Sequence, residues 1–138
     1  PQGARCGVSR ILVIDASIAV DLIARLRPEP IEEVLWAPDS RLAAPEVIDV
    51  EVLHALCRLD RAGRIPASRS DLAGELKSLP IRRYRHASLL KGIWSLRGHL
   101  TAYDAAYVVL AHLLNATLVT RDERLARASG QCDRVLLP

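Results

Sequence analysis

The 138-residue sequence has no phenylalanine and no methionine, and aromatic residues make up only 4% of it. A core must therefore be built from Leu, Val, Ile and Ala, as is common where helices cover a sheet. Hydrophobic residues make up 50% of the chain and charged residues 25%, a balance that excludes an intrinsically disordered protein. A chain of this length buries about two-thirds of its unfolded surface. We therefore expect a single domain over residues 1–138 that folds without a metal or disulfide.

Long apolar runs and paired cysteines are also missing. No apolar stretch is long enough to cross a membrane as a helix, and residues 1–10, a possible flexible leader, lack the apolar segment of a signal peptide. Cys6, Cys57 and Cys132 are odd in number and far apart, which excludes a complete disulfide framework and a C-x-x-C site. These features favour a cytoplasmic protein without a membrane partner.

Lysine is scarce, because 17 of the 19 basic residues are Arg. The net charge of +3 is compatible with a polyanionic partner. The forked guanidinium group of Arg suits phosphate. A genome rich in G and C would produce the same bias, so the composition alone leaves both explanations open.

Short apolar runs alternate with helical patterns along the chain. Strands are predicted over residues 11–14, 42–44, 81–84, 117–120 and 134–137. Helices are predicted over residues 17–27, 31–36, 45–62, 68–79, 86–97, 101–114 and 122–128. This alternation predicts the α/β class, with a parallel sheet covered on both faces and ligands beyond the carboxyl ends of its strands.

The expected helix starts rest on familiar capping residues. Ser17 is expected to cap the first helix, and Asp122 the last one. Pro45 is expected in the first turn of its helix, and Ser68 or Ser70 at the start of the next.

Four acidic residues lie near the expected carboxyl ends of strands. Asp15 ends the first strand, Asp122 follows the fourth, Asp104 lies in the first turn of a helix, and Glu51 lies in the helix after the second strand. Each has a structural alternative: a turn residue, a helix cap, a capping box with Thr101, or a solvated helix residue. Asp15, Asp104 and Asp122 can reach one edge of one sheet together, and Glu51 can join them if the first turns of its helix lean over that edge. We therefore interpret the four acids as a cluster.

Such a cluster needs a counter-charge. Two carboxylates about 5 Å apart repel by about 3 kcal/mol at an effective dielectric of about 20. Mg²⁺ prefers oxygen ligands and binds through a few carboxylates plus substrate phosphate, whereas the His and Cys residues show no spacing typical of zinc sites. The sequence therefore predicts a Mg²⁺ site that can activate water and hold a phosphodiester in line.

The four acids lie in the segments ILVIDAS (11–17), PEVIDVEVLHAL (45–56), LTAYDAAYV (100–108) and VTRDERL (119–125). In this order and spacing, the segments resemble the four motifs of PIN-domain proteins, most closely those of VapC toxins from bacterial toxin–antitoxin pairs. The resemblance covers nearly the whole chain, from about Arg10 to the end.

The resemblance implies a three-layer α/β/α sandwich with a five-stranded parallel sheet, and an endoribonuclease dependent on Mg²⁺ or Mn²⁺. It implies that one acidic quartet serves both metal binding and catalysis: Asp15, Glu51, Asp104 and Asp122. Ser17 and Thr120 match the small hydroxyl positions beside this quartet. The resemblance also implies a homodimer, and an antitoxin of VapB type whose tail fills the active-site groove.

Basic residues outside the motifs are candidates for contacts with RNA phosphates or an acidic partner segment. They are Arg58, Arg61, Arg64, Arg82 and Arg83. A solvated basic surface is the alternative for each of them. Aromatic side chains can stack on bases, but their scarcity favours core or dimer contacts for Trp94 and Tyr107.

We interpret the sequence as that of a metal-dependent endoribonuclease that cuts single-stranded RNA and is inhibited by an antitoxin. Because water rather than a ribose 2′-hydroxyl would attack, the products would carry a 5′-phosphate and a 3′-hydroxyl. One alternative is an inactive PIN-like module that only binds an antitoxin or RNA, although all four acids are present. A phosphotransfer domain is disfavoured, because a second Asp beside Asp15 is missing.

Overall fold

The computed structural model describes residues 9–25, 30–130 and 134–136. Most of the expected leader, residues 1–8, lies outside the described residues, as do Cys6, Cys132 and Leu137. Of the expected leader, Arg10 already belongs to the first strand. Cys57 is exposed and free.

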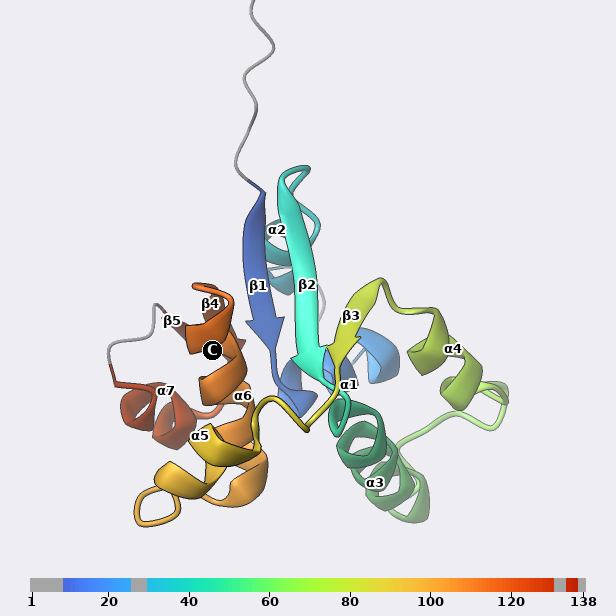
Figure 1. Cartoon of the computed structure of the whole chain (residues 1–138). Coiled ribbons are helices and arrows are strands. Elements are labelled where there is room, and N and C mark those ends of the chain that lie inside the picture. The colour runs from blue at the N-terminus through green and yellow to red at the C-terminus, as the bar shows by residue number, and fades with distance from the viewer. Residues whose placement is uncertain (1–8, 26–29, 131–133, 137–138) are drawn as a thin grey trace, which may run out of the picture.

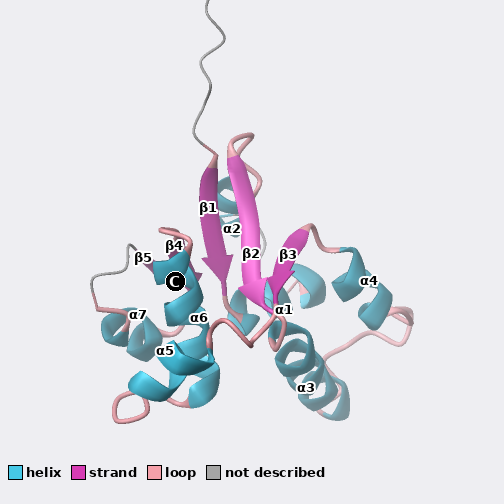
Figure 2. Ribbon diagram, in the orientation of Figure 1, coloured by secondary structure: helices cyan, strands magenta, loops and turns pink. Residues whose placement is uncertain are grey.

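The strands form one parallel sheet, so the predicted α/β class is confirmed (Figures 1 and 2). They are β1 (Arg10–Ile14), β2 (Ser40–Pro45), β3 (Ile81–Tyr84), β4 (Thr117–Thr120) and β5 (Arg134–Leu136). The spatial order is β3-β2-β1-β4-β5, and Leu12 in β1 is paired with Leu42 of β2 and Thr117 of β4. In chain order, β2 and β3 are added on one side of β1, and β4 and β5 are then added on its other side. The order therefore reverses between β1 and β4, which is where open α/β sheets bind ligands.

Helices cover both faces of this sheet. They are α1 (Ala16–Ala24), α2 (Pro30–Leu35), α3 (Ile48–Arg61), α4 (Leu72–Ser78), α5 (Leu90–Ser95), α6 (Ala102–Leu113) and α7 (Glu123–Ala128). Helix α6 packs against β1, β2 and β4, and α2 lies behind β2 in Figure 1. Helix α1 packs against β4 and α3. None of the helices in the described parts of the chain has the length and apolarity needed to cross a membrane.

The core is aliphatic, as the composition requires. Leu12, Val13 and Ile14 of β1 are fully buried, and Tyr107 of α6 is the bulkiest of the fully buried side chains described. Each buried Leu or Ile stabilises the fold by about 1.5–3 kcal/mol. A central strand held this firmly fixes the position of Asp15, the residue that follows it.

Two helix starts differ from the expectation, because a carboxylate caps where a hydroxyl was expected. Asp15, rather than Ser17, caps α1 by accepting a hydrogen bond from the backbone N–H three residues on, at 3.2 Å. Asp71, rather than Ser68 or Ser70, caps α4 in the same way, at 3.0 Å. A charged acceptor forms a stronger hydrogen bond to a backbone N–H than a hydroxyl does, which explains both corrections.

The predicted helices at 45–62 and 86–97 are shorter in the structure. Pro45 ends β2, where it is paired with Tyr84, and α3 begins only at Ile48. His86 precedes α5 by several residues, because its Nε2 accepts a hydrogen bond from the Val47 backbone at 3.2 Å. A tertiary contact thus replaces the local helical pattern at His86.

Candidate active site

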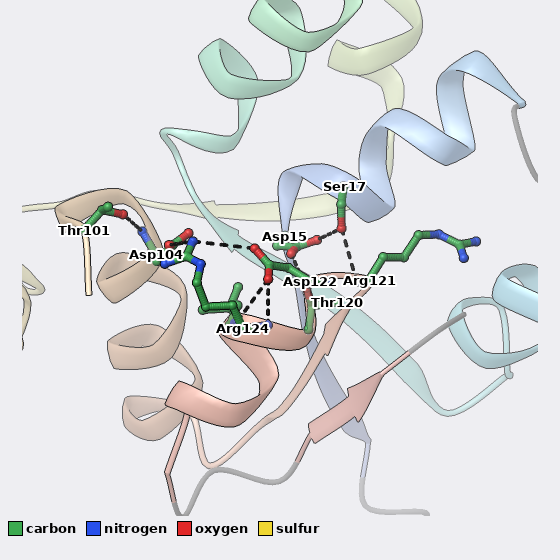
Figure 3. Close-up of polar contacts among 9 residues, drawn as sticks. Asp15, Ser17, Thr101, Asp104, Thr120, Arg121, Asp122 and Arg124 are labelled. Atoms are coloured by element: carbon green, nitrogen blue, oxygen red, sulfur yellow. Dashed lines mark hydrogen bonds and ion pairs between the residues drawn. The ribbon is translucent and has the colours of Figure 1, made fainter. Parts of the chain in front are cut away.

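Asp15 lies at the carboxyl end of β1, where the strand order reverses. Its carboxylate is buried but fully bonded: Oδ1 accepts from the Ser17 hydroxyl at 2.5 Å and from the Ile18 backbone at 3.2 Å. Its Oδ2 accepts from the hydroxyl of Thr120, the last residue of β4 (Figure 3). The structure thus places both predicted hydroxyl residues on Asp15, and they hold its carboxylate in one orientation.

Asp122 follows β4 and caps α7, as predicted. Its Oδ1 accepts from the backbone N–H groups of Arg124 and Leu125, at 2.8 and 3.1 Å. Its own backbone N–H donates to Thr120 Oγ1 at 2.9 Å. The Thr120 hydroxyl therefore links Asp122 to the Asp15 carboxylate, while Oδ2 of Asp122 makes no capping bond.

Asp104 lies in the first turn of α6, which Thr101 caps by accepting from the Asp104 backbone at 3.2 Å. The capping box that was the structural alternative for Asp104 is only half formed, because the Asp104 carboxylate accepts from Arg124 Nη2 at 2.7 Å (Figure 3). The same nitrogen lies 3.7 Å from Asp122 Oδ2. The hydrogen bond to Asp104 and the negative charge of the Asp104 carboxylate raise the pKa of Arg124. Sequence reasoning missed Arg124; the available signal was a cation two residues after Asp122.

Glu51 is held by Tyr107, whose hydroxyl donates to Glu51 Oε1 at 2.8 Å. Tyr107 is a core residue, as expected, but its link to the site was missed; the available signal was its place one helical turn after Asp104. Burial raises the pKa of Glu51, the Tyr107 hydrogen bond opposes this rise, and the charges of Asp104 and Asp15 add to it.

The pKa of Asp15 is also raised, mainly by burial and to a smaller degree by the charge of Asp122, against its three hydrogen bonds. The charges of Asp15, Glu51, Asp104 and Asp122 therefore act on one another. The structure brings the predicted acids from four separate segments into one electrostatic cluster beside the switch point of the sheet.

Comparison with known proteins identifies the family. A family model described as the PIN domain matches residues 12–131. The chain belongs to the PIN-domain family. Ribonuclease VapC3 of Mycobacterium tuberculosis is 42% identical over 118 residues, which cover 85% of this chain and 86% of that protein. Ribonuclease VapC9 of the same organism is 36% identical over 130 residues, covering 93% of this chain and 99% of the relative. The chain is thus homologous to VapC ribonucleases.

The fold of this PIN domain also has a counterpart among solved structures. The crystal structure of PAE2754 from Pyrobaculum aerophilum matches with a TM-score of 0.69 at 24% identity. The match covers 97% of this chain and 88% of that chain. At this level of identity the likeness concerns the fold.

PIN-domain nucleases generally depend on a metal, and the donor set here suits a hard cation. The side chains that bond to the Asp15 carboxylate are the hydroxyls of Ser17 and Thr120, and the charge of Asp122 acts on it, so the donors are the oxygen ligands that Mg²⁺ prefers. Within the described parts of the chain, no three acidic, histidine or cysteine side chains converge closely enough to hold an ion. Mg²⁺ keeps several waters and often uses only one or two carboxylates, so the residues fit this ion.

The raised pKa of Glu51 predicts how stability depends on pH. A carboxyl with a higher pKa in the folded than in the unfolded state binds its proton more readily when folded. In metal-free buffer, lowering the pH from about 7 towards about 5 should therefore make this group less destabilising. Glu51→Gln keeps an acceptor for Tyr107 but cannot titrate, so its melting temperature should depend less on pH than that of the wild type.

Calorimetric scans across this pH range check the prediction. Glu123→Gln, an exposed change on α7, is the matched control and should keep the wild-type pH dependence. Parallel curves for all three proteins would show that the Glu51 carboxyl does not contribute.

The structure separates the predicted RNA-binding arginines by environment. Arg58 and Arg61 are exposed along α3. Arg82 stacks over the Tyr84 ring at 5.1 Å and lines an open pocket of about 660 Å³ with Ile11 of β1. That pocket also takes in the first residues of β2, so it lies towards the amino ends of the strands, away from the acids.

Arg83 is committed to the fold rather than free for a ligand. Its Nε bonds to Asp49 of α3 at 2.9 Å, its Nη2 to the Leu76 carbonyl at 2.8 Å, and its Nη1 to the Ile81 carbonyl at 3.1 Å. These bonds tie α3, α4 and β3 together. The predicted substrate role of Arg83 therefore has no support in its contacts.

Proposed function

We propose that this chain is a Mg²⁺-dependent endoribonuclease that cuts single-stranded RNA, acting as the toxin of a toxin–antitoxin pair. The observation that carries the proposal is the buried carboxylate of Asp15, which lies where the strand order reverses and lies within electrostatic influence of Glu51 and Asp122. Relatives of this chain that align over most of its length are named as ribonucleases. Carboxylates beside a buried acid suit phosphodiester hydrolysis better than they suit a purely structural role.

The acids divide the work according to their surroundings. One or two of the four carboxylates, those of Asp15, Asp104, Asp122 and Glu51, would hold Mg²⁺, which when bound would supply Lewis-acid stabilisation of the phosphodiester and activation of water. Ser17 and Thr120 keep Asp15 in one orientation. Glu51, whose pKa is raised, is a better proton acceptor than an ordinary carboxylate and suits proton removal from the attacking water.

The second candidate function is an inactive PIN-like module. One observation favours it: Arg124 already neutralises Asp104 at 2.7 Å, so the cluster has a counter-ion within the same chain. In such a module the Arg124–Asp104 ion pair would be permanent, and Mg²⁺ would not alter the melting temperature. In the nuclease, Mg²⁺ must displace Arg124.

We also propose a VapB-type antitoxin as partner, and a homodimer. Exposed apolar side chains flank the acids, with Val50 on α3 beside Glu51 in sequence and Tyr103 on α6 beside Asp104. A partner segment could cover these side chains while an Arg or Lys side chain bridges the carboxylates. Binding and inhibition would then be one event, because the cation occupies the oxygens that Mg²⁺ needs.

Incubation of the purified protein with total RNA tests the proposal. We expect cleavage with Mg²⁺, none with excess chelator, and 5′-phosphate and 3′-hydroxyl ends when the cuts are mapped by sequencing. Addition of the product of the adjacent gene should stop the reaction. Cleavage that persists in chelator, or 2′,3′-cyclic phosphate ends, would contradict the mechanism. Absence of any cleavage under all these conditions would favour the inactive module.

A further inference from the structure

An open pocket of about 470 Å³ lies beside the acidic cluster, between α1 and α3. Ser17 and Asp21 of α1, Ala55 of α3, Arg64 and Arg121 line it. Arg121 lies between Thr120 and Asp122 in the chain and extends away from the Arg124–Asp104 pair (Figure 3). The pocket thus continues the acidic edge on the side of Asp15 opposite to Asp104.

One hydroxyl connects this pocket to the cluster. The Arg121 backbone N–H donates to Ser17 Oγ at 3.3 Å, and Ser17 Oγ donates to Asp15 Oδ1 at 2.5 Å. A group bound in the pocket would therefore lie one side chain away from Asp15.

Arg121 is held firmly in the pocket wall. Its guanidinium forms an ion pair with Asp21, one helical turn after Ser17 on α1, and both side chains are nearly buried. The pair is made through Nε and fixes the planar guanidinium, while the N–H donors on Nη1 and Nη2, unlike those of Arg83, form no hydrogen bond or ion pair with a described residue. Because a preorganised donor loses little conformational entropy on binding, Arg121 suits recognition of a phosphate.

The second cation of the pocket is Arg64, which is placed there by the turn that follows α3. Gly63 has a φ of 69°, in the left-handed region, and donates to the Asp60 carbonyl at 2.9 Å. The Arg64 backbone N–H then donates to the Leu59 carbonyl at 2.9 Å. This pair of bonds is a Schellman motif, which turns the chain sharply after the helix. It places Arg64 at the pocket that Arg121 lines.

The charges in the pocket leave a net positive balance. Asp21 neutralises Arg121, whereas Arg64 is exposed and forms no ion pair with another described residue. The cation excess faces the pocket, next to a cluster with the opposite charge. A phosphodiester needs both features: acids with a metal at the bond to be cut, and cations at the adjoining phosphate.

We propose that Arg121 and Arg64 form a subsite for the phosphate adjacent to the scissile one, with both arginines as positioning residues. This inference rests on the proposed ribonuclease function and assigns the direction in which the RNA strand leaves the acids. In this direction the RNA strand runs through the pocket between α1 and α3, past Ser17, rather than over the pocket that Arg82 lines.

The test is RNA binding in an Asp104→Asn background, where binding is measured without cleavage. The probe is a short random-sequence single-stranded RNA labelled with fluorescein, followed by fluorescence anisotropy over a series of KCl concentrations. Adding Arg64→Ala should weaken binding by about fivefold and reduce the slope of log affinity against log salt by about 0.7, the loss of one single-strand phosphate contact.

The matched control is Arg127→Ala, which removes the same charge from an exposed position on α7. It should leave the slope of the background protein unchanged. If Arg64→Ala and Arg127→Ala have equal affinities and slopes, the subsite is wrong. Failure of the ribonuclease proposal would be seen separately, as an intact total RNA pool with the wild-type protein.

A second variant tests Arg121 without leaving a buried charge unpaired. The double change Asp21→Asn with Arg121→Gln keeps the net charge and replaces the ion pair with two amides that can still bond to each other. We expect weaker binding at an unchanged melting temperature, with little change in the salt slope because the ion pair is already neutral. Binding by the double variant as tight as that of the Asp104→Asn background would overturn the role of Arg121.

Discussion

Asp104→Asn should reduce Mg²⁺-stimulated RNA cleavage by at least about 100-fold, a loss typical of removing one charged group that stabilises a phosphoryl transition state. The substitution keeps the shape of the side chain and removes its charge. Its effect on folding should be small, because the Arg124 partner of Asp104 is 62% exposed and can be solvated by water instead. Cleavage rates and melting temperatures of the same preparation separate the two effects.

Glu123→Gln provides the control for this experiment. Glu123 is an acid next to Asp122, but its side chain is 69% exposed and pairs with Arg127 rather than with the cluster. It should retain wild-type activity. Equal activity of Asp104→Asn and the wild type would remove Asp104 from the catalytic site, and with it the proposed mechanism.

Arg124→Ala should tighten Mg²⁺ binding by about tenfold. Arg124 Nη2 lies 2.7 Å from Asp104 Oδ2 and 3.7 Å from Asp122 Oδ2, so it competes with a metal for these carboxylates. Without it, the carboxylates repel one another in metal-free buffer, and the melting temperature should fall. Mg²⁺ should then raise the melting temperature more than it does in the wild type, because it binds only the folded state.

Isothermal titration of the metal-free protein with MgCl₂ measures this affinity independently of activity. Arg127→Ala removes an equal charge three residues later on the same helix and is the control for general electrostatics. If both variants bind Mg²⁺ as the wild type does, Arg124 does not compete with the metal. If only the melting temperature falls, Arg124 has a structural role alone.

The order of the elements could be predicted from local patterns. The run Ile11 to Ile14 is apolar and mostly β-branched, as is typical of a strand covered on both faces, and Leu118 and Val119 in β4 are likewise apolar and buried. Asp15 follows its run directly and Asp122 lies two residues after the end of β4, so the geometry of a parallel sheet predicts that both lie at the same edge. The predicted caps at Ser17, and at Ser68 or Ser70, were wrong because a neighbouring carboxylate was the stronger acceptor.

The sequence by itself thus determined the fold class and predicted the set of acids, because strand periodicity and a residue just after a strand are local properties of the chain. Only the tertiary structure decided what surrounds each acid. Tyr107 reaches Glu51 across 56 residues of chain, and Arg124 reaches Asp104 across 20. These partners depend on how α3, α6 and α7 pack around one sheet edge. A long side chain can reach several hydrogen-bond partners, and the packing of the helices decides which partner lies within bonding distance.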